Sequence, residues 1–280
     1  MIGSICGDII GSRFEFNNIS NEDFGDLFTS KSVYTDDTVL SVATANAILD
    51  ESGDYSGQYL AYAQSYPNRG YGGNFAQMIK QGKLEPYDSY GNGAAMRVSP
   101  VGWIHPDIES TLASAKATAE CSHSHEEGIK GAQAIASAIY WARCGSGKDD
   151  IMKHVEEFGY DLSKKVADFR QGQFDVTCQG TIPRCMAILN ETDSFESAIR
   201  KTIVLGGDTD TNGAIVGGMC DGLYGLPKRE IIEAVYARIP KQMASVITRF
   251  TKKYIDKDFI EPENIATIAS TAADALSAIF

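Results

Sequence analysis

The sequence lacks the marks of several protein classes. Its six cysteines include no Cys-x-x-Cys pair and no dense spacing, which argues against a zinc knuckle or a disulfide framework. No apolar run approaches the length of a membrane span. Charges at Asp8, Arg13 and Glu15 interrupt the apolar N-terminus too early for a signal peptide. We therefore expect reduced thiols, a cytoplasmic location and no membrane partner.

Positive charge is also scarce. The chain has 25 Lys and Arg against 37 Asp and Glu, which gives a formal net charge of −12. Such a surface repels nucleic-acid backbones and anionic membranes, so neither is expected as the main partner, whereas cations are attracted.

The 280 residues, 43% of them hydrophobic, can bury a sizeable core. Because no linker or fixed repeat divides the chain, a single domain over residues 1–280 is predicted.

Period-2 alternation, which is typical of half-buried strands, is almost absent. Apolar residues recur three and four positions apart along most of the chain, which predicts an all-α fold. The clearest helix, 124–143, has an acidic first turn, an apolar stripe and a glycine after its end. Further helices are predicted over 39–49, 107–119, 148–158, 179–189, 194–204, 212–223, 227–238, 241–252 and 263–277. The longest irregular stretches, where binding chemistry usually lies, are 17–34, 65–73 and 85–93.

Two short acidic clusters each precede a predicted helix of small residues: Thr-Asp-Asp-Thr at 35–38 and Gly-Gly-Asp-Thr-Asp-Thr at 206–211. Mg²⁺ and Mn²⁺ prefer such carboxylate and hydroxyl oxygens, so the clusters could form two halves of one metal site. Alternatively, each cluster is a helix N-cap, since Asp and Thr accept hydrogen bonds from first-turn amides. One Asp satisfies a cap and a second repels it, so the matched pair favours metal binding.

Five motifs follow one another along the chain. They are Gly-x₃-Gly-Asp-x₂-Gly-x₃-Glu at 3–15, the cluster at 35–38, Gly-Asn-Gly-Ala-Ala-Met-Arg at 91–97, Ser-His-Ser-His at 122–125 and the cluster at 206–211. In this order they resemble the ADP-ribosylglycohydrolases over about residues 3–227. The resemblance implies a compact orthogonal helical domain with two Mg²⁺ (or Mn²⁺) ions at its centre. It also implies hydrolysis of the bond between ADP-ribose C1″ and an acceptor, with ADP-ribose as product and an ADP-ribosylated protein or small ADP-ribosyl conjugate as partner.

The resemblance also implies roles for individual residues. The metal ligands fall on Thr35, Asp36, Asp37, Asp208, Asp210 and Thr211, and the catalytic carboxylate falls on Glu15. A carboxylate beside an anomeric carbon can stabilise oxocarbenium charge or activate water, so Glu15 would be a general base or a metal-gating ligand. Alternatively, Glu15 is a solvated carboxylate in a loop. Asp8 is interpreted as a structural hydrogen-bonding residue.

The segment 88–93 has the composition of an anion-binding loop, because Gly permits positive φ and successive amides can cradle phosphate. Asn-Gly is also simply a turn signal. Met96 would face either the pocket or the core. The resemblance makes His123 a residue near the distal ribose, whereas His125 is interpreted as a helix-start residue. The substrate-binding residues that it implies are Ser89, Tyr90, Gly91, Asn92, Gly93, Met96 and His123. An adenine needs an aromatic or apolar sandwich, and the aromatic candidates near the loops are Tyr34, Tyr66, Tyr71, Tyr87, Tyr90 and Phe24.

Two other functions stay open. An ADP-ribose-binding module without turnover would keep the pocket, although the intact ligand set and Glu15 count against it. A metal-dependent nucleotide phosphohydrolase is also possible, since paired Asp at two ions suits attack on phosphorus.

The chain departs from the family pattern at Ile9, where a small residue is common, and in the short connection from Glu15 to Thr35. The acceptor, whether arginine, serine or another group, is therefore left open, as are the native metal and the oligomeric state.

Overall fold

The computed structural model describes residues 1–262. Within them the secondary structure consists of α-helices and two single-turn 3₁₀ helices, so the all-α prediction is confirmed. The helix predicted at 263–277 lies outside the described residues, and the division into one domain stays a prediction. No helix within 1–262 has the length and apolar character needed to cross a membrane.

The helices follow one another along the chain, and the longest connection, residues 12–35, joins α1 to α2. Nine of the predicted helices are present, with ends shifted by a few residues. The bounds are α1 (Ile2–Gly11), α2 (Asp36–Leu49), α3 (Tyr55–Ser65), α4 (Gly73–Gln81), α5 (Gly93–Met96), η1 (Val101–Trp103), α6 (Ile108–Glu120), α7 (Glu126–Arg143), α8 (Lys148–Glu156), η2 (Val166–Asp168), α9 (Cys178–Asn190), α10 (Phe195–Leu205), α11 (Thr209–Tyr224), α12 (Arg229–Tyr236) and α13 (Lys241–Tyr254).

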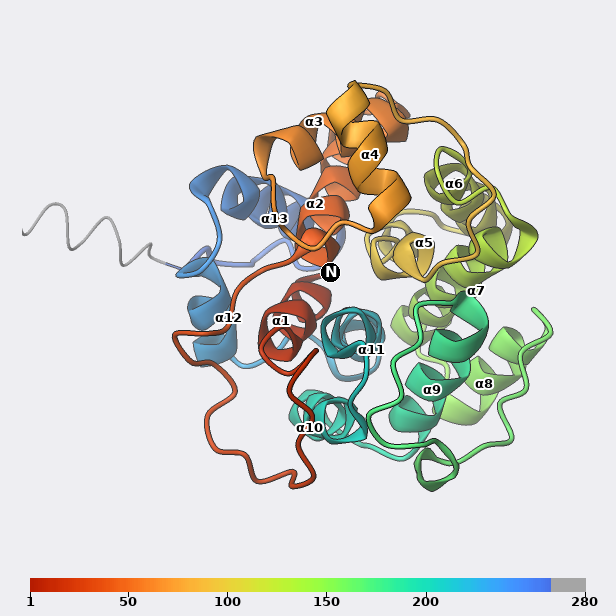
Figure 1. Cartoon of the computed structure of the whole chain (residues 1–280), viewed down its shortest axis with the longest axis vertical. Helices are drawn as coiled ribbons and strands as arrows, with labels where there is room; N and C mark the ends of the chain where they lie inside the picture. The colour runs from red at the N-terminus through yellow and green to blue at the C-terminus, as the bar shows by residue number, and fades with distance from the viewer. Residues whose placement is uncertain (263–280) are drawn as a thin grey trace, which may run out of the picture.

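Helices α1 and α11 lie side by side at the centre of the molecule (Figure 1). Glycines at four-residue spacing line the contact on both helices. A Cβ atom on Gly7 would lie 1.9 Å from the carbonyl oxygen of Gly213, and one on Gly217 would lie 2.0 Å from that of Gly3. Such contact between backbones requires residues without side chains. The glycines of the 3–15 motif therefore set how closely the two helices approach.

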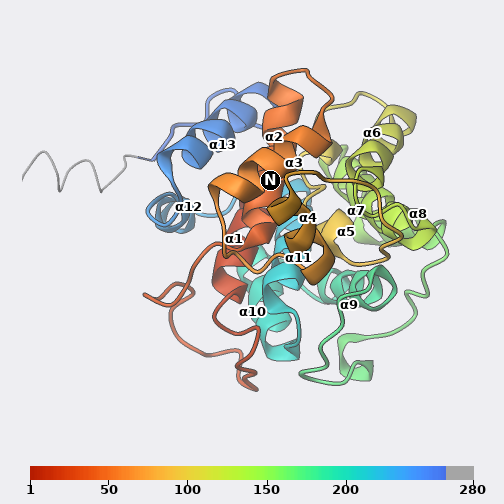
Figure 2. The same ribbon diagram turned by 45° about the horizontal axis from the view of Figure 1, so that its top comes forward.

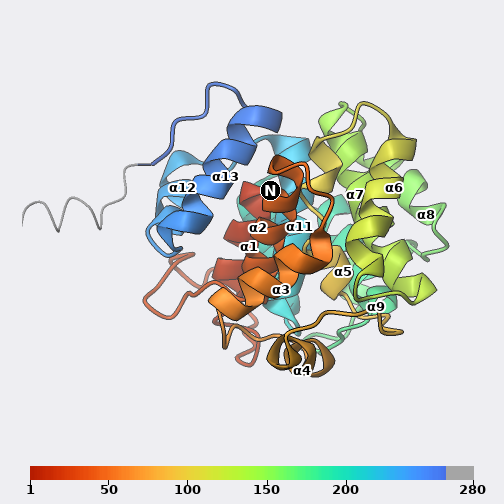
Figure 3. The same ribbon diagram turned by 90° about the horizontal axis from the view of Figure 1, so that it is seen from above.

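The other helices surround this central pair. Helix α2 packs beside α1 and α11, with α12 and α13 on one side and α6 to α9 on the other (Figures 2 and 3). The end of α1 meets the start of α11, where the Thr209 hydroxyl donates to the Gly11 carbonyl at 2.9 Å. This arrangement brings the chain after α1 and the first turns of α2 and α11 to one place.

Candidate active site

The first acidic cluster opens helix α2. Thr35 is its N-cap, since its hydroxyl oxygen accepts the N–H of Asp37 at 3.3 Å. The fully buried Asp8 accepts the Thr35 hydroxyl at 2.7 Å and the amides of Thr35 and Thr38 at 3.0 and 3.1 Å, besides the Thr38 hydroxyl. The expected structural role of Asp8 is therefore visible in its contacts, because its oxygens hold the turn in place. Capping falls to Thr35 and leaves Asp36 and Asp37 free for other contacts.

The second acidic cluster opens helix α11 through two glycines with positive φ. Gly206 and Gly207 have φ values of 73° and 83°, and a Cβ on Gly207 would lie 2.3 Å from the Gln173 carbonyl oxygen. Asp208 stands at the N-cap position, but its side chain makes no capping hydrogen bond. It instead accepts the side-chain amide of Asn92 at 2.7 Å. The capping interpretation therefore does not account for Asp208.

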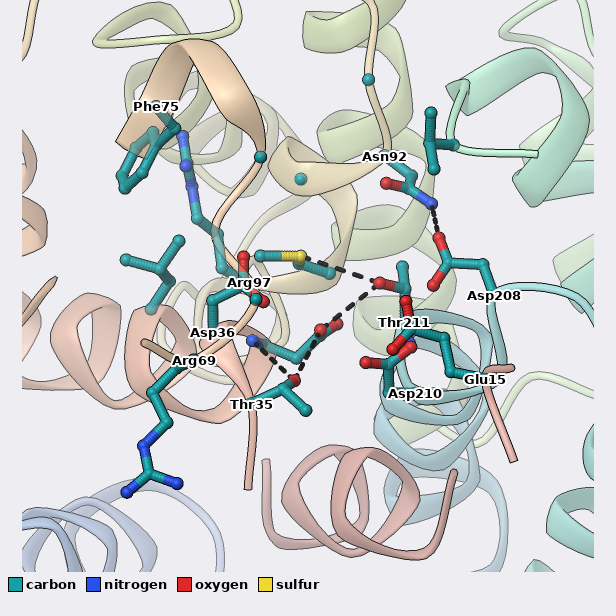
Figure 4. A pocket seen from close by; sticks show the side chains of 18 of the residues that line it. Glu15, Thr35, Asp36, Arg69, Phe75, Asn92, Arg97, Asp208, Asp210 and Thr211 are labelled. Atoms are coloured by element: carbon teal, nitrogen blue, oxygen red, sulfur yellow. Dashed lines mark hydrogen bonds between the residues drawn. The ribbon is translucent and has the colours of Figure 1, made fainter. Parts of the chain in front are cut away.

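The two clusters meet across the interface between α2 and α11. The Thr211 hydroxyl donates to Asp37 Oδ2 at 3.3 Å. One carboxylate oxygen from each of Asp8, Asp37 and Asp210 lies within 4.8 Å of the others, so the halves predicted from sequence lie together (Figure 4).

A second group of carboxylates shares Asp210. Oxygens of Glu15, Asp208 and Asp210 also lie within 4.8 Å of one another. Glu15 is half-buried in the loop that follows α1, and it faces the same space as the two aspartates. Asp36 lines this space but belongs to neither group; its Oδ1 is directed toward Gly70, where a Cβ would lie 3.2 Å away.

Burial dominates the electrostatics of the cluster. Removal from water disfavours the charged carboxylates and raises their pKa values, and for three of them the nearby Asp210 raises the pKa further. The aspartates affected in this way are Asp36, Asp37 and Asp208, while burial alone raises the pKa of Asp210. Such a cluster favours either protons or bound cations.

The basic side chains of the described residues do not neutralise these carboxylates. Within residues 1–262, none of the aspartates of the cluster pairs with Lys or Arg. Arg69 lines the same cavity, but its guanidinium stacks over the Tyr34 ring at 3.8 Å and points away from the carboxylates (Figure 4). Oδ1 of Asp37 is buried without a hydrogen-bond partner. A buried oxygen without a partner beside unneutralised carboxylates fits a divalent cation.

We expect the metal-free protein to lose stability as the pH rises from 5 to 8. Burial and neighbouring carboxylates raise the pKa of Glu15 and of Asp8 to about 7. These groups hold protons more tightly in the folded chain than in the unfolded chain, so their contribution is complete at low pH and is lost as the pH passes about 7. Urea unfolding in EDTA should give a lower free energy of unfolding at pH 8 than at pH 5. A rise over this range would contradict the expectation, and Glu15→Gln should reduce the slope.

A cavity of about 640 Å³ opens over the carboxylates. Its wall includes all but one of the residues that the resemblance implies. These are Glu15, Thr35, Asp36, Asp37, Ser89, Gly91, Asn92, Gly93, Met96, His123, Asp208, Asp210 and Thr211. The exception is Tyr90, which is 50% exposed and packs its ring on His125 at 5.4 Å outside this cavity.

The loop 88–93 differs from the predicted phosphate cradle. The amide of Gly91 donates to Ser89 Oγ at 3.2 Å, and that of Asn92 donates to the Val176 carbonyl at 2.8 Å. Both amides are therefore already bonded, and neither Gly91 nor Gly93 has a positive φ. Gly93 instead provides space, because a Cβ there would lie 2.8 Å from Nε2 of His123.

The structure places Met96, whose position the sequence left open, and His125, which was interpreted as a helix-start residue. Met96 faces the cavity, with its sulfur 4.0 Å from the Thr211 hydroxyl. His125 is the N-cap of α7, since its Nδ1 accepts the N–H of Glu127 at 3.0 Å. The interpretation of His125 as a helix-start residue is confirmed.

Sequence reasoning missed an aromatic pair at the cavity. Phe16, which directly follows Glu15, is 84% exposed and stacks on Phe174 with ring centroids 5.9 Å apart. Both rings line the cavity, as do Tyr34 and Tyr87 from the predicted aromatic set. Phe174 belongs to no motif, so only its exposed aromatic character in a loop could have drawn attention to it.

The fold and the site define a helical protein with a buried cluster of carboxylates that could hold a metal ion. The family model of the ADP-ribosylglycohydrolases matches residues 1–258, and the chain belongs to this family. The expected family and its class of enzyme, the ADP-ribosyl glycohydrolases, are thereby confirmed.

Individual relatives are distant in sequence. The chain is 23% identical to the ADP-ribosylhydrolase ARH3 of Xenopus tropicalis, over 80% of this chain and 86% of that protein. It is 27% identical to the ADP-ribosyl-[dinitrogen reductase] glycohydrolase of Rhodospirillum rubrum, over 80% and 84%. A solved structure described as an ADP-ribosylglycohydrolase-related protein complex superposes with a TM-score of 0.66 at 18% identity, covering 88% and 94% of the two chains. That likeness bears on the fold alone.

Proposed function

We propose that this protein hydrolyses the C1″ glycosidic bond between ADP-ribose and an acceptor, and that it uses a binuclear Mg²⁺ or Mn²⁺ centre. The observation that carries the proposal is the meeting of Asp37, Asp208 and Asp210, from helices far apart in sequence, in a cavity that also contains Glu15. Family membership supports the reaction class. The acceptor would be a protein side chain such as arginine or serine, or a small conjugate.

The metal-binding residues in this proposal are those implied by the resemblance. The buried, unpartnered oxygen of Asp37 and the lack of basic partners in residues 1–262 fit two hard cations. The ligands would be Thr35, Asp36, Asp37, Asp208, Asp210 and Thr211. When bound, such ions would accept ribose hydroxyl oxygens as ligands and would lower the pKa of a bound water.

Glu15 would act as the general base in this reaction. Its pKa, raised to about 7 by burial and by Asp210, suits a group that accepts a proton near neutral pH. As the bond from C1″ to the acceptor breaks, the Glu15 carboxylate can stabilise positive charge on the sugar. The acceptor leaves with the electron pair of the broken bond, while water forms the new bond to C1″ and gives one proton to Glu15; that proton then passes to the acceptor.

The test is product analysis by mass spectrometry with arginine- and serine-linked ADP-ribosyl peptides. We expect free ADP-ribose from one or both peptides, no release in EDTA, and a rate at least about 100-fold lower in Glu15→Gln. Glu22→Gln is the matched control, because Glu22 lies exposed in the same loop and outside the cavity; its rate should equal that of the wild type.

The products separate this proposal from the two alternatives. Release of AMP or phosphate instead of ADP-ribose would indicate a phosphohydrolase. Tight binding of ADP-ribose, without hydrolysis of either peptide in Mg²⁺ or Mn²⁺, would favour a binding module. The peptide that is cleaved identifies the acceptor class.

A further inference from the structure

A buried chain of hydrogen bonds joins Arg97 to His123, and both residues line the cavity. The Arg97 side chain is fully buried, and its Nη2 donates to the Thr118 carbonyl at 2.8 Å and to Ser122 Oγ at 2.7 Å. Ser122 Oγ in turn lies 2.8 Å from Nδ1 of His123. The sequence marks Arg97 and Ser122 only as members of two motifs and assigns neither a function.

The donor and acceptor roles along this chain follow from the chemistry of the groups. A guanidinium has only donors, so Ser122 Oγ must accept from Arg97. The hydroxyl hydrogen of Ser122 is then available to donate, and Nδ1 of His123 is its hydrogen-bond partner within residues 1–262. Donation to Nδ1 leaves this buried hydroxyl hydrogen paired, and in that arrangement Nδ1 accepts and the proton of the neutral ring resides on Nε2.

The surroundings of His123 keep its ring neutral. Burial and the positive charge of Arg97 lower its pKa to about 3. Tyr87 also lies against the ring, and burial raises the pKa of its hydroxyl, so it is neutral as well. His123 therefore presents one N–H and no charge near pH 7.

The Nε2–H group faces the cavity. A Cβ on Gly93 would lie 2.8 Å from Nε2, and both residues line the cavity wall. Nε2 makes no hydrogen bond within the described part of the chain, so its donor is available to a ligand.

Arg97 adds a positive charge behind this donor. Its Nε and Nη1 atoms are buried without hydrogen-bond partners, and no carboxylate within residues 1–262 pairs with it. The ring of Tyr59, with its centroid 4.1 Å from the guanidinium carbon, provides a cation–π contact instead. We call the hydrogen-bonded chain of Arg97, Ser122 and His123 the relay. The positive charge of Arg97 polarises this relay, so that Nε2–H donates more strongly to an electron-rich ligand atom in the cavity.

We propose that Arg97 and Ser122 are positioning residues that fix His123 as a neutral Nε2–H donor to an acceptor oxygen of the ADP-ribosyl ligand. The inference rests on the proposed function for the identity of the ligand, but the tautomer itself does not depend on it. A phosphate oxygen and a ribose oxygen share the required acceptor chemistry.

The tautomer can be read directly by long-range ¹H–¹⁵N correlation on protein labelled at histidine. The His123 signals are assigned by their loss in His123→Asn. At pH 7 without ligand, we expect Nδ1 to resonate as an unprotonated ring nitrogen and Nε2 as a protonated one. The opposite tautomer, or a doubly protonated ring, would overturn the proposal. Ser122→Ala should change this pattern, whereas the matched control Ser124→Ala, which follows His123 in the sequence but lies outside this chain of hydrogen bonds, should not.

Binding of ADP-ribose and ADP to the metal-loaded protein locates the accepting oxygen. In Ser122→Ala we expect about tenfold weaker ADP-ribose binding and a raised KM, with kcat changed by less than about twofold, because a ground-state hydrogen bond is weakened. Equal weakening for ADP indicates a phosphate oxygen, and weakening for ADP-ribose alone indicates the distal ribose. Unchanged affinity for both overturns the relay. Absence of hydrolysis by the wild type would count against the proposed function and leave the tautomer result standing.

Discussion

Asp210→Asn should abolish hydrolysis and at the same time make the metal-free protein more stable. Asp210 belongs to both carboxylate groups, so its charge is needed by any cation held between them. We expect the hydrolytic rate to fall at least about 100-fold. In EDTA, however, the substitution removes a buried like charge from the cluster. Asn retains the oxygen that accepts the N–H of Thr211 at 3.0 Å, so the first turn of α11 should stay intact.

Three measurements test this combination of effects. ADP-ribose release gives the rate, and thermal unfolding in EDTA should show a higher Tm than the wild type. Mg²⁺ should raise the Tm of the wild type, since a ligand bound only by the folded state stabilises it, but should not raise that of Asp210→Asn. Asp149→Asn is the matched control, because Asp149 occupies the same position in the first turn of α8 and is exposed. Full activity in Asp210→Asn, or a lower Tm in EDTA, would rule out the proposed centre.

Two helices show what the periodicity of the sequence can and cannot predict. Helix α7 has a polar face and an apolar stripe, so its periodicity marks it clearly. Helix α1 was not predicted, because all ten of its residues are buried and no polar face alternates with an apolar one. Its glycines also lower its intrinsic helix propensity. Only the partner α11 explains both features, and single-sequence periodicity contains no information about a partner.

The same distinction holds for the site. Residue type is local, so the Asp and Thr clusters could be identified as candidate ligands from the sequence. Hydrogen bonds between distant segments cannot be read from local residue types. The backbone N–H of Asn92 donates to the carbonyl of Val176, which belongs to a loop with no motif. The backbone N–H of Asn92 is therefore not available to the phosphate cradle that the sequence predicted. The stacked pair of Phe16 and Phe174 was missed for the same reason.

Gly7→Ala should have the largest effect on stability. Helix propensity alone predicts the opposite, since Ala is favoured over Gly by about 1 kcal/mol inside a helix. The new Cβ, however, would lie 1.9 Å from the Gly213 carbonyl oxygen, and a backbone atom cannot rotate away as a side chain can. Helices α1 and α11 must separate, so we expect a loss of about 3 kcal/mol or more in the free energy of unfolding. Urea unfolding at pH 7 in EDTA measures this loss.

The control for Gly7→Ala is Gly73→Ala in the first turn of α4. A Cβ there meets no atom within 4 Å, so the free energy of unfolding should be unchanged or slightly higher. If both variants lose stability equally, the cost is not due to the contact between α1 and α11. Separation of the helices should also displace Asp8 and the Glu15 loop from Asp210, because the end of α1 is tied to Thr209 at the start of α11. Any Gly7→Ala protein that remains folded should therefore bind metal more weakly than the wild type, since the glycine contact sets the spacing of the carboxylates.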